Sequence, residues 1–180
     1  MYLYNFMTSM RKMKLVRPTL EYAYDIEEFK DEFISAGEDV INGGELLDSM
    51  DSIGKWIEYV SNNASSDRVS PDWVLTDTYL AVVDERIVGV ICLRHCLNDF
   101  LSDFGHIAFS VRPGDRRKGY AGMMLSLILD KARKLGMKKV KLSAEKDNVA
   151  SIRTIVSNGG VYVYSFNFDG SEVLSYLIKL

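Results

Sequence analysis

The stretch Val111-Arg112-Pro113-Gly114-Asp115-Arg116-Arg117-Lys118-Gly119-Tyr120-Ala121-Gly122 joins two different hydrophobic patterns. An apolar, strand-like segment (105–111) precedes it, and an amphipathic helical pattern (121–135) follows it. Backbone N–H groups at a helix N-terminus lack intrahelical partners and lie at the positive end of the helix dipole. Three consecutive basic residues add full charges there, and Gly119 lets the backbone approach a ligand closely. Together these features predict a site that binds phosphate.

The size and charge of the chain narrow the class of protein. Its 180 residues suffice for one core, and we expect a tail over residues 1–13 and a single domain over 14–180. The net charge of −3 argues against binding nucleic acid or an anionic membrane by bulk electrostatics, so the basic loop favours a small anionic ligand. We find neither a secretory signal nor a stretch of roughly 20 apolar residues, and we therefore expect a cytoplasmic protein.

The two cysteines, Cys92 and Cys96, lie four residues apart in a strand-like segment. This spacing places them on one face of a strand but too far apart for an easy disulfide. We expect two free thiols, buried or half-buried.

The remaining hydrophobic patterns predict strands interleaved with helices. We expect a strand at 14–17, helices at 22–36 and 51–60, a hairpin at 76–83 and 87–97, a strand at 104–111, a helix at 121–135, a strand at 138–144, a helix at 148–157 and a final hairpin at 161–168 and 172–178. This order predicts an α/β (α+β) fold with a mixed, mostly antiparallel sheet of about six to seven strands and helices on both faces. The segment between the first two helices either shapes a substrate entrance or covers the sheet.

The basic loop and its surroundings resemble the GNAT acetyltransferase superfamily. The signature of that superfamily is Arg or Gln, two residues, Gly, one residue, then Gly or Ala, and residues 116–121 match it after the Val-x-Pro of 111–113. A second signature, an Asn three residues before a small residue and then a glycine break, is matched by Asn148, Ser151 and the run 158–160.

The resemblance covers nearly the whole chain, because the element order agrees from about Lys14 to the C-terminus. Residues 93–121 further resemble a bacterial branch of the superfamily. The implied fold is a single domain in which the strand at 104–111 splays from the strand at 138–144. The strand edge that this splay exposes would bind coenzyme A.

The resemblance implies acetyl-CoA as the acyl donor and no metal. The residues expected to contact it are Phe109, Ser110, Val111, Arg116, Arg117, Lys118, Gly119, Tyr120, Ala121, Gly122, Asn148 and Ser151. The loop 116–122 would hold the pyrophosphate, and the backbone of 109–111 would bond the pantetheine and polarise the thioester carbonyl. Asn148 either bonds the pantetheine or only caps the helix that follows it.

The implied reaction is direct attack by a neutral primary amine on the thioester, which needs a proton acceptor and an acid for the departing thiolate. Members of the superfamily often supply the acid from a tyrosine seven residues after the Asn, and here that position is Ile155. Three tyrosines of the last hairpin are possible substitutes: Tyr162, Tyr164 and Tyr176.

The candidate catalytic base is His106. The superfamily positions for a carboxylate or histidine on the strand before the loop fall at Gly105 and Ile107, so strand alternation turns His106 the other way unless a bulge intervenes. The alternatives are a structural role for His106, the carboxylate Glu145 as base, or catalysis by positioning in a water-free site without a dedicated base.

Two other polar residues, Arg94 and His95, either bind substrate or pair with Asp99 or Asp103.

The acceptor is expected to be a small-molecule or peptide amine, and the protein is expected to be a monomer or homodimer. A second hypothesis is a non-catalytic acyl-CoA-binding or regulatory module, which the residue Ile155 favours. A nucleotide hydrolase is a poor match, because the pattern Gly-x-x-x-x-Gly-Lys-Ser/Thr is missing.

Overall fold

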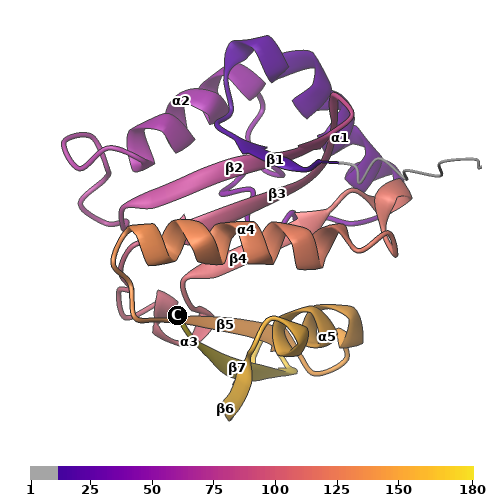
Figure 1. Ribbon diagram of the computed structural model, residues 1–180. Coiled ribbons are helices and arrows are strands. Elements are labelled where there is room, and N and C mark those ends of the chain that lie inside the picture. The colour runs from indigo at the N-terminus through magenta and orange to yellow at the C-terminus, as the bar shows by residue number, and fades with distance from the viewer. Residues whose placement is uncertain (1–11) are drawn as a thin grey trace, which may run out of the picture.

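The protein, described over residues 12–180 by a computed structural model, consists of two antiparallel sheets flanked by helices (Figure 1). The strands are β1 (Lys14–Val16), β2 (Thr76–Val83), β3 (Arg86–Arg94), β4 (Ile107–Val111), β5 (Lys139–Glu145), β6 (Val161–Phe168) and β7 (Ser171–Lys179). The α-helices are α1 (Ala23–Ser35), α2 (Ile53–Asn63), α3 (Leu101–Phe104), α4 (Tyr120–Lys134) and α5 (Val149–Ser157). The strand orders are β1-β2-β3-β4 and β5-β7-β6. The predicted fold class is confirmed, and the element order agrees except for the additional helix α3. The strands form two sheets with antiparallel pairs rather than the one mixed sheet that we expected.

The predicted tail is only partly within the described chain. Residues 1–11 lie outside it, so no structure is assigned to them. Met13, which we placed in the tail, is only 6% exposed and packs in the main hydrophobic core. The packed domain therefore includes Met13.

Helices α1 and α2 cover one face of the first sheet (Figure 1). The apolar residues of α1 recur every three or four positions, so that Ile26, Phe29 and Phe33 share one buried face. The helix α2 begins after Ser52, whose hydroxyl accepts a hydrogen bond from the backbone N–H of Lys55. The hydrophobic pattern and the capping residue thus agree with the predicted positions of both helices.

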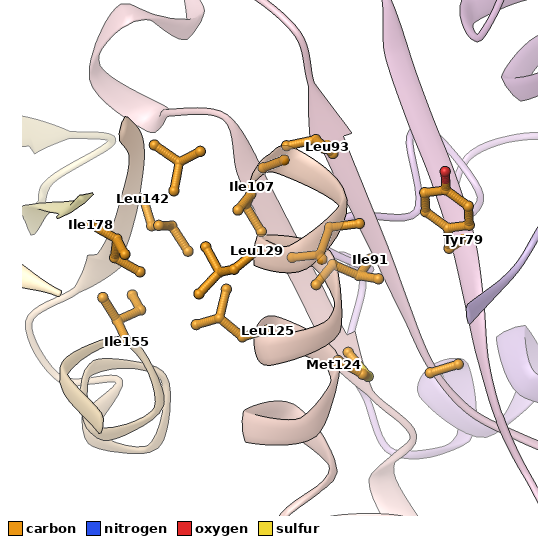
Figure 2. Packing of buried hydrophobic residues seen from close by; sticks show 14 of the residues in the cluster. Tyr79, Ile91, Leu93, Ile107, Met124, Leu125, Leu129, Leu142, Ile155 and Ile178 are labelled. Carbon is orange, nitrogen blue, oxygen red and sulfur yellow. The ribbon is translucent and has the colours of Figure 1, made fainter. Parts of the chain in front are cut away.

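The opposite face of this sheet packs against α4, and α5 lies beside the second sheet (Figure 1). Figure 2 shows Leu125 and Leu129 of α4 pointing toward Leu142 of β5, whereas Ile91 of β3 lies on the other side of the helix in this view. These side chains are at most 3% exposed. Because the apolar face of α4 shares one buried cluster with residues of β3 in the first sheet and of β5 in the second, it joins the two sheets into one core.

The strand before the basic loop begins later than predicted. We expected it from Phe104, but residues 101–104 form the short helix α3, and β4 begins at Ile107. The side-chain oxygen of Asn98 accepts a hydrogen bond from the N–H of Leu101, which stabilises the first turn. Gly105 then ends the helix with a positive φ of 97°, a conformation that residues with a Cβ rarely adopt.

The strands β4 and β5 meet at a single bridge, between Gly105 and Leu142. A Cβ on Gly105 would overlap the carbonyl of Lys141, so only glycine allows the two chains to approach this closely. Beyond this bridge, no strand pair joins β4 to β5 within residues 12–180. The predicted splay is present, and it divides the seven strands into two sheets.

The cysteine prediction is half right. Cys92 and Cys96 are both free, as expected, and Cys92 is buried in β3. Cys96 is exposed, because β3 ends at Arg94 and the chain leaves the sheet before it.

The close approach at Gly105 can be tested against a glycine with similar backbone geometry. Gly37 also has a positive φ, of 74°, but a Cβ there would meet nothing within 4 Å. We expect Gly37→Ala to cost about 1 kcal/mol of unfolding free energy, from backbone strain alone. We expect Gly105→Ala to cost about 3 kcal/mol or more of unfolding free energy, because backbone strain is combined with steric overlap between the new Cβ and the carbonyl of Lys141. Urea unfolding of both variants measures the difference, and equal losses would contradict this account of the bridge.

Candidate active site

A groove of about 530 Å³ opens where β4 and β5 separate, between the N-terminal ends of α4 and α5. The residues that line it are Asn42, Phe109, Ser110, Val111, Arg116, Arg117, Gly119, Tyr120, Ala121, Gly122, Asn148, Ala150, Ser151 and Thr154. Eleven of the twelve predicted contact residues belong to this set, and Lys118 does not. The sequence signatures, 26 or more residues apart in the chain, therefore meet at one groove.

The first wall of the groove is β4. This strand pairs with β3 on one side, from Ile107 opposite Leu93 to Val111 opposite Gly89. On its other side, residues 109–111 have no strand partner in the described chain. Unpaired backbone N–H and C=O groups of an edge strand bind an extended ligand readily.

The second wall is the start of α4. Gly119 is the N-cap, with a φ of 81°, and its carbonyl accepts the first helical bond from the N–H of Met123. The N–H groups of residues 120–122 precede that bond and so have no intrahelical acceptor. A Cβ on Gly119 would meet nothing within 4 Å, so the space above this backbone is open. Such a site suits an anion.

The third wall is the start of α5. The side-chain oxygen of Asn148 accepts a hydrogen bond from the N–H of Ser151, so the helix-cap role is present. Both residues also line the groove, and the amide nitrogen of Asn148 is not used by this cap. Capping and ligand binding are therefore compatible. Ala150 and Thr154, which the sequence reasoning missed, lie on the same helix face.

The three predicted cations differ in their surroundings. Arg116 forms a bidentate ion pair with Glu38, at 2.6 and 2.7 Å. The Nζ of Lys118 lies 2.6 Å from a carboxylate oxygen of Asp115, and Lys118 is not among the residues that line the groove. Arg117 is exposed, lines the groove and has no carboxylate partner in the described chain. We expected all three cations to contact phosphate. The surroundings of Arg117 fit this expectation best, and the position of Lys118 argues against a phosphate contact by Lys118.

A network of charges holds the loop before α4. The carboxylate of Glu32 on α1 accepts hydrogen bonds from Nε of Arg112, at 2.6 Å, and from the N–H of Gly114, at 2.7 Å. Burial alone would raise the pKa of Glu32, but these bonds and the charges of Arg112 and Arg86 outweigh it, so its pKa is lowered. Asp115 similarly accepts from Arg86, at 2.9 Å. Helix α1 thus fixes a loop 80 residues away in the chain.

The segment between α1 and α2 lies against β4. A Cβ on Gly43 would overlap the carbonyl of Ala108, so this glycine allows direct backbone contact. Asn42, next to it, lines the groove. The buried carboxylate of Glu45 accepts from Arg94 at 2.8 Å. The segment covers the sheet, because Ile41 and Leu47 are buried against it, and Asn42 forms part of the groove rim. A role as a substrate entrance stays a prediction.

His106 lies at the start of β4 and does not line the groove. Its Nδ1 accepts a hydrogen bond from the backbone N–H of Lys141, at 3.0 Å. Burial and the neighbouring positive charges of Lys141 and Arg94 lower its pKa, which favours the neutral ring at pH 7. Because Nδ1 is the acceptor, the neutral ring carries its proton on Nε2. This tautomer has no free lone pair, which disfavours a role as general base.

The other acid–base candidates also lie outside the groove lining. Ile155 is fully buried in the core (Figure 2). The hydroxyl of Tyr164 donates to Asp103 at 2.7 Å, while Tyr176 is buried and Tyr162 is 53% exposed. Glu145 is the last residue of β5, is exposed and is not among the residues that line the groove. Among the described residues that line the groove, none carries a carboxylate or an imidazole.

The predicted partners of Arg94 and His95 were wrong. Arg94 is buried and pairs with Glu45 rather than Asp99 or Asp103. Its guanidinium also donates to the carbonyl of Gly105 at 3.1 Å. The Nε2 of His95 lies 3.0 Å from Asp77, on the strand beside it.

The family follows from a comparison with known domains. A model described as the acetyltransferase (GNAT) family matches residues 48–159, more than half of the chain. This chain is a GNAT acetyltransferase family member. The match begins after α1 and the following segment, so Glu32, Glu38 and Asn42 lie outside the part of this GNAT chain that the model covers.

Solved structures of GNAT proteins share the fold at low sequence identity. The protein yncA of Salmonella typhimurium, solved with acetyl-CoA, has a TM-score of 0.67 and 15% identity over 93% of this chain and 94% of its own. The microcin C7 self-immunity acetyltransferase MccE, solved with acetyl-CoA and AMP, has a TM-score of 0.71 and 14% identity over 94% and 93%. RimL, a ribosomal L7/L12 α-N-protein acetyltransferase solved with coenzyme A, has a TM-score of 0.70 and 13% identity over 96% of both chains. No curated protein matches the sequence significantly.

The described residues of this GNAT member also bear on membrane and metal binding. Between residues 12 and 180, no helix is long and apolar enough to cross a membrane. The same residues contain no group of three or more His, Cys, Asp or Glu side chains that could hold a metal ion.

The anchor between α1 and the loop predicts a pH-dependent stability. We expect Glu32→Gln to lower the unfolding free energy by about 2 kcal/mol at pH 7, because the buried Arg112 loses a charged partner. The lowered pKa of Glu32 means that its contribution is present above the ordinary value of 4.5 and is lost as the pH falls through the folded-state value. The difference between the variant and the unaltered protein should therefore shrink below pH 4.5.

Urea unfolding between pH 7 and pH 3 measures this difference. The matched control is Glu27→Gln, which changes an exposed carboxylate of the same helix. We expect the control to change stability little at any pH. A Glu32→Gln loss as large at pH 3 as at pH 7 would contradict the assignment.

Proposed function

We propose that this protein is an acetyl-CoA-dependent N-acyltransferase that moves an acetyl group to a primary amine of a small molecule or peptide. One observation carries the proposal: an unpaired strand edge, the free N–H groups of a helix start and an exposed arginine line the same groove. A long ligand with amides at one end and phosphates at the other needs this combination. The family and the GNAT structures solved with acetyl-CoA or coenzyme A support it.

The residues present fit the phosphate end of the cofactor. The open space above Gly119 and the N–H groups of 120–122 suit a pyrophosphate, and Arg117 adds a full positive charge. The edge of β4 at residues 109–111 has no strand partner and can bond the amides of a pantetheine arm, with Asn148 opposite it, while the carbonyl of Val111 already accepts from Nε of Arg116. We assign these residues to cofactor binding, and we leave Lys118 out because Asp115 holds it.

The bound thioester supplies an activated acetyl group. Strand β4 orients it, and a backbone N–H among residues 109–111 stabilises negative charge on the carbonyl oxygen. The described lining offers no carboxylate or imidazole to take the proton of the amine. We therefore propose catalysis mainly by positioning, with the proton leaving through water. The acceptor is a primary amine by analogy with RimL, an α-N-protein acetyltransferase.

The alternative function is an acyl-CoA-binding module without turnover. The burial of Ile155 and the lack of a base in the described lining favour it. We propose a monomer or homodimer in the cytoplasm for either function, with no nucleic acid or membrane partner.

Release of free thiol from acetyl-CoA in the presence of a panel of primary amines distinguishes the two functions. We expect amine-dependent release that rises with pH, because only the neutral amine attacks. Coenzyme A binding by calorimetry without release on any amine would favour the module. No binding of coenzyme A at all would overturn both.

A substitution in the helix start tests the phosphate site. We expect Gly119→Asn to weaken coenzyme A binding by about tenfold, because a Cβ enters the space needed by the pyrophosphate. Asparagine tolerates a positive φ better than other residues with a side chain, so unfolding free energy should change little. The matched control is Gly136→Asn, at a φ of 79° with equally open surroundings beyond the other end of α4. Equal affinity of both variants for coenzyme A would refute the assignment.

A further inference from the structure

Arg116 is already bonded through each of its guanidinium nitrogens. Its Nε donates to the carbonyl of Val111 at 3.2 Å, and its two terminal nitrogens donate to the two carboxylate oxygens of Glu38. Its guanidinium also lies 5.7 Å from the ring of Phe33 on α1. A planar guanidinium paired in this way is held in one orientation.

Arg117, the next residue, has the opposite surroundings. It has a φ of 63°, so the chain turns sharply between the two arginines. It is exposed, and within the described chain its side chain has no hydrogen-bond or ion-pair partner. An incoming phosphate can bond Arg117 without displacing an existing ion pair, whereas bonding Arg116 requires it to leave Glu38.

Glu38 begins the segment that leads to the groove rim. Its own N–H donates to the carbonyl of Phe33 at the end of α1. Four residues later, Asn42 lines the groove, and Gly43 contacts the backbone of β4. The ion pair with Arg116 therefore ties this rim segment, residues 38–45, to the loop before α4.

We propose that Glu38 and Arg116 form a clasp that positions the rim segment and Asn42 against the cofactor groove, and that Arg117 is the arginine side chain that binds the cofactor phosphates. The inference deepens the proposed function and rests on it for the identity of the ligand. Arg116, the first residue of the signature loop, is then a positioning residue in this chain. The clasp stays closed when the cofactor is bound.

The clasp also gives the rim segment a role in the reaction. Asn42 lines the groove and is next to Gly43, which contacts the backbone of Ala108 and Phe109 in β4. An amide side chain there can bond the pantetheine arm or the acceptor amine. Fixing the segment to Arg116 keeps Asn42 in place during both binding events.

Calorimetric titration with coenzyme A separates the two arginines. We expect Arg117→Gln to raise the Kd about tenfold, the value of one hydrogen bond to a charged group. We expect Arg116→Gln to raise it less than about threefold, since this side chain makes no phosphate contact. The control is Arg68→Gln, which removes an exposed arginine outside the groove and measures the effect of net charge alone. Equal losses for Arg116 and Arg117, or a larger loss for Arg116, would overturn the proposal.

Hydrogen exchange tests the clasp without any acceptor. We expect Glu38→Gln and Arg116→Gln each to speed amide exchange in residues 38–45 about fivefold, as expected for the loss of an exposed ion pair. The control Glu27→Gln, on the exposed side of α1, should leave these rates unchanged. Unchanged rates in the two clasp variants would overturn the proposal.

The same measurement with saturating coenzyme A decides whether the clasp opens. We expect residues 38–45 of the unaltered protein to keep or increase their protection. Exchange that rises to the level of Glu38→Gln would show that Arg116 leaves Glu38 for the ligand, and would overturn the proposal. If coenzyme A does not bind, the proposed function fails, while exchange in the free protein still tests the ion pair.

Discussion

The separation of β4 from β5 is the constraint on which the site depends. Gly105 brings the two strands together at one bridge, and its positive φ turns the chain so that they then diverge. The edge of β4 at residues 109–111 is left without a strand partner, and backbone N–H and C=O groups need hydrogen-bond partners. A ligand with its own amides can satisfy them. The groove is therefore a consequence of sheet geometry, and the residues on its walls are placed by α4 and α5.

Charge pairs between distant segments shape the basic loop. Four cations between Arg112 and Lys118 would repel each other, yet three of them are paired with Glu32, Glu38 or Asp115. The pairs tie the loop to α1 and to the rim segment, which lowers the conformational entropy that a ligand must remove on binding. Arg117 has no such partner in the described chain and can bind an anion. The cations of this loop thus divide into three that are paired with carboxylates and one, Arg117, that lines the groove without such a partner in the described chain.

Much of the fold could be predicted because its signals are local. The apolar spacing of α4, the capping Asn148 and the Asp169-Gly170 turn of the last hairpin depend on neighbours within a few residues. The start of β4 was misplaced because α3 is stabilised by a hydrogen bond that the N–H of Leu101 donates to the side-chain oxygen of Asn98. Propensity alone does not report such a bond.

The sequence by itself determined the order of the elements, the family resemblance and eleven of the residues around the groove, because each follows from a local pattern or a short signature. Only the tertiary structure decided how the charged side chains are used. Arg116 and Glu38 are 78 residues apart, and no periodicity links them. The same holds for His106, whose proton position is set by a backbone N–H of β5. Pairing over such distances depends on how the helices pack against the sheets, so it becomes visible only in the folded chain.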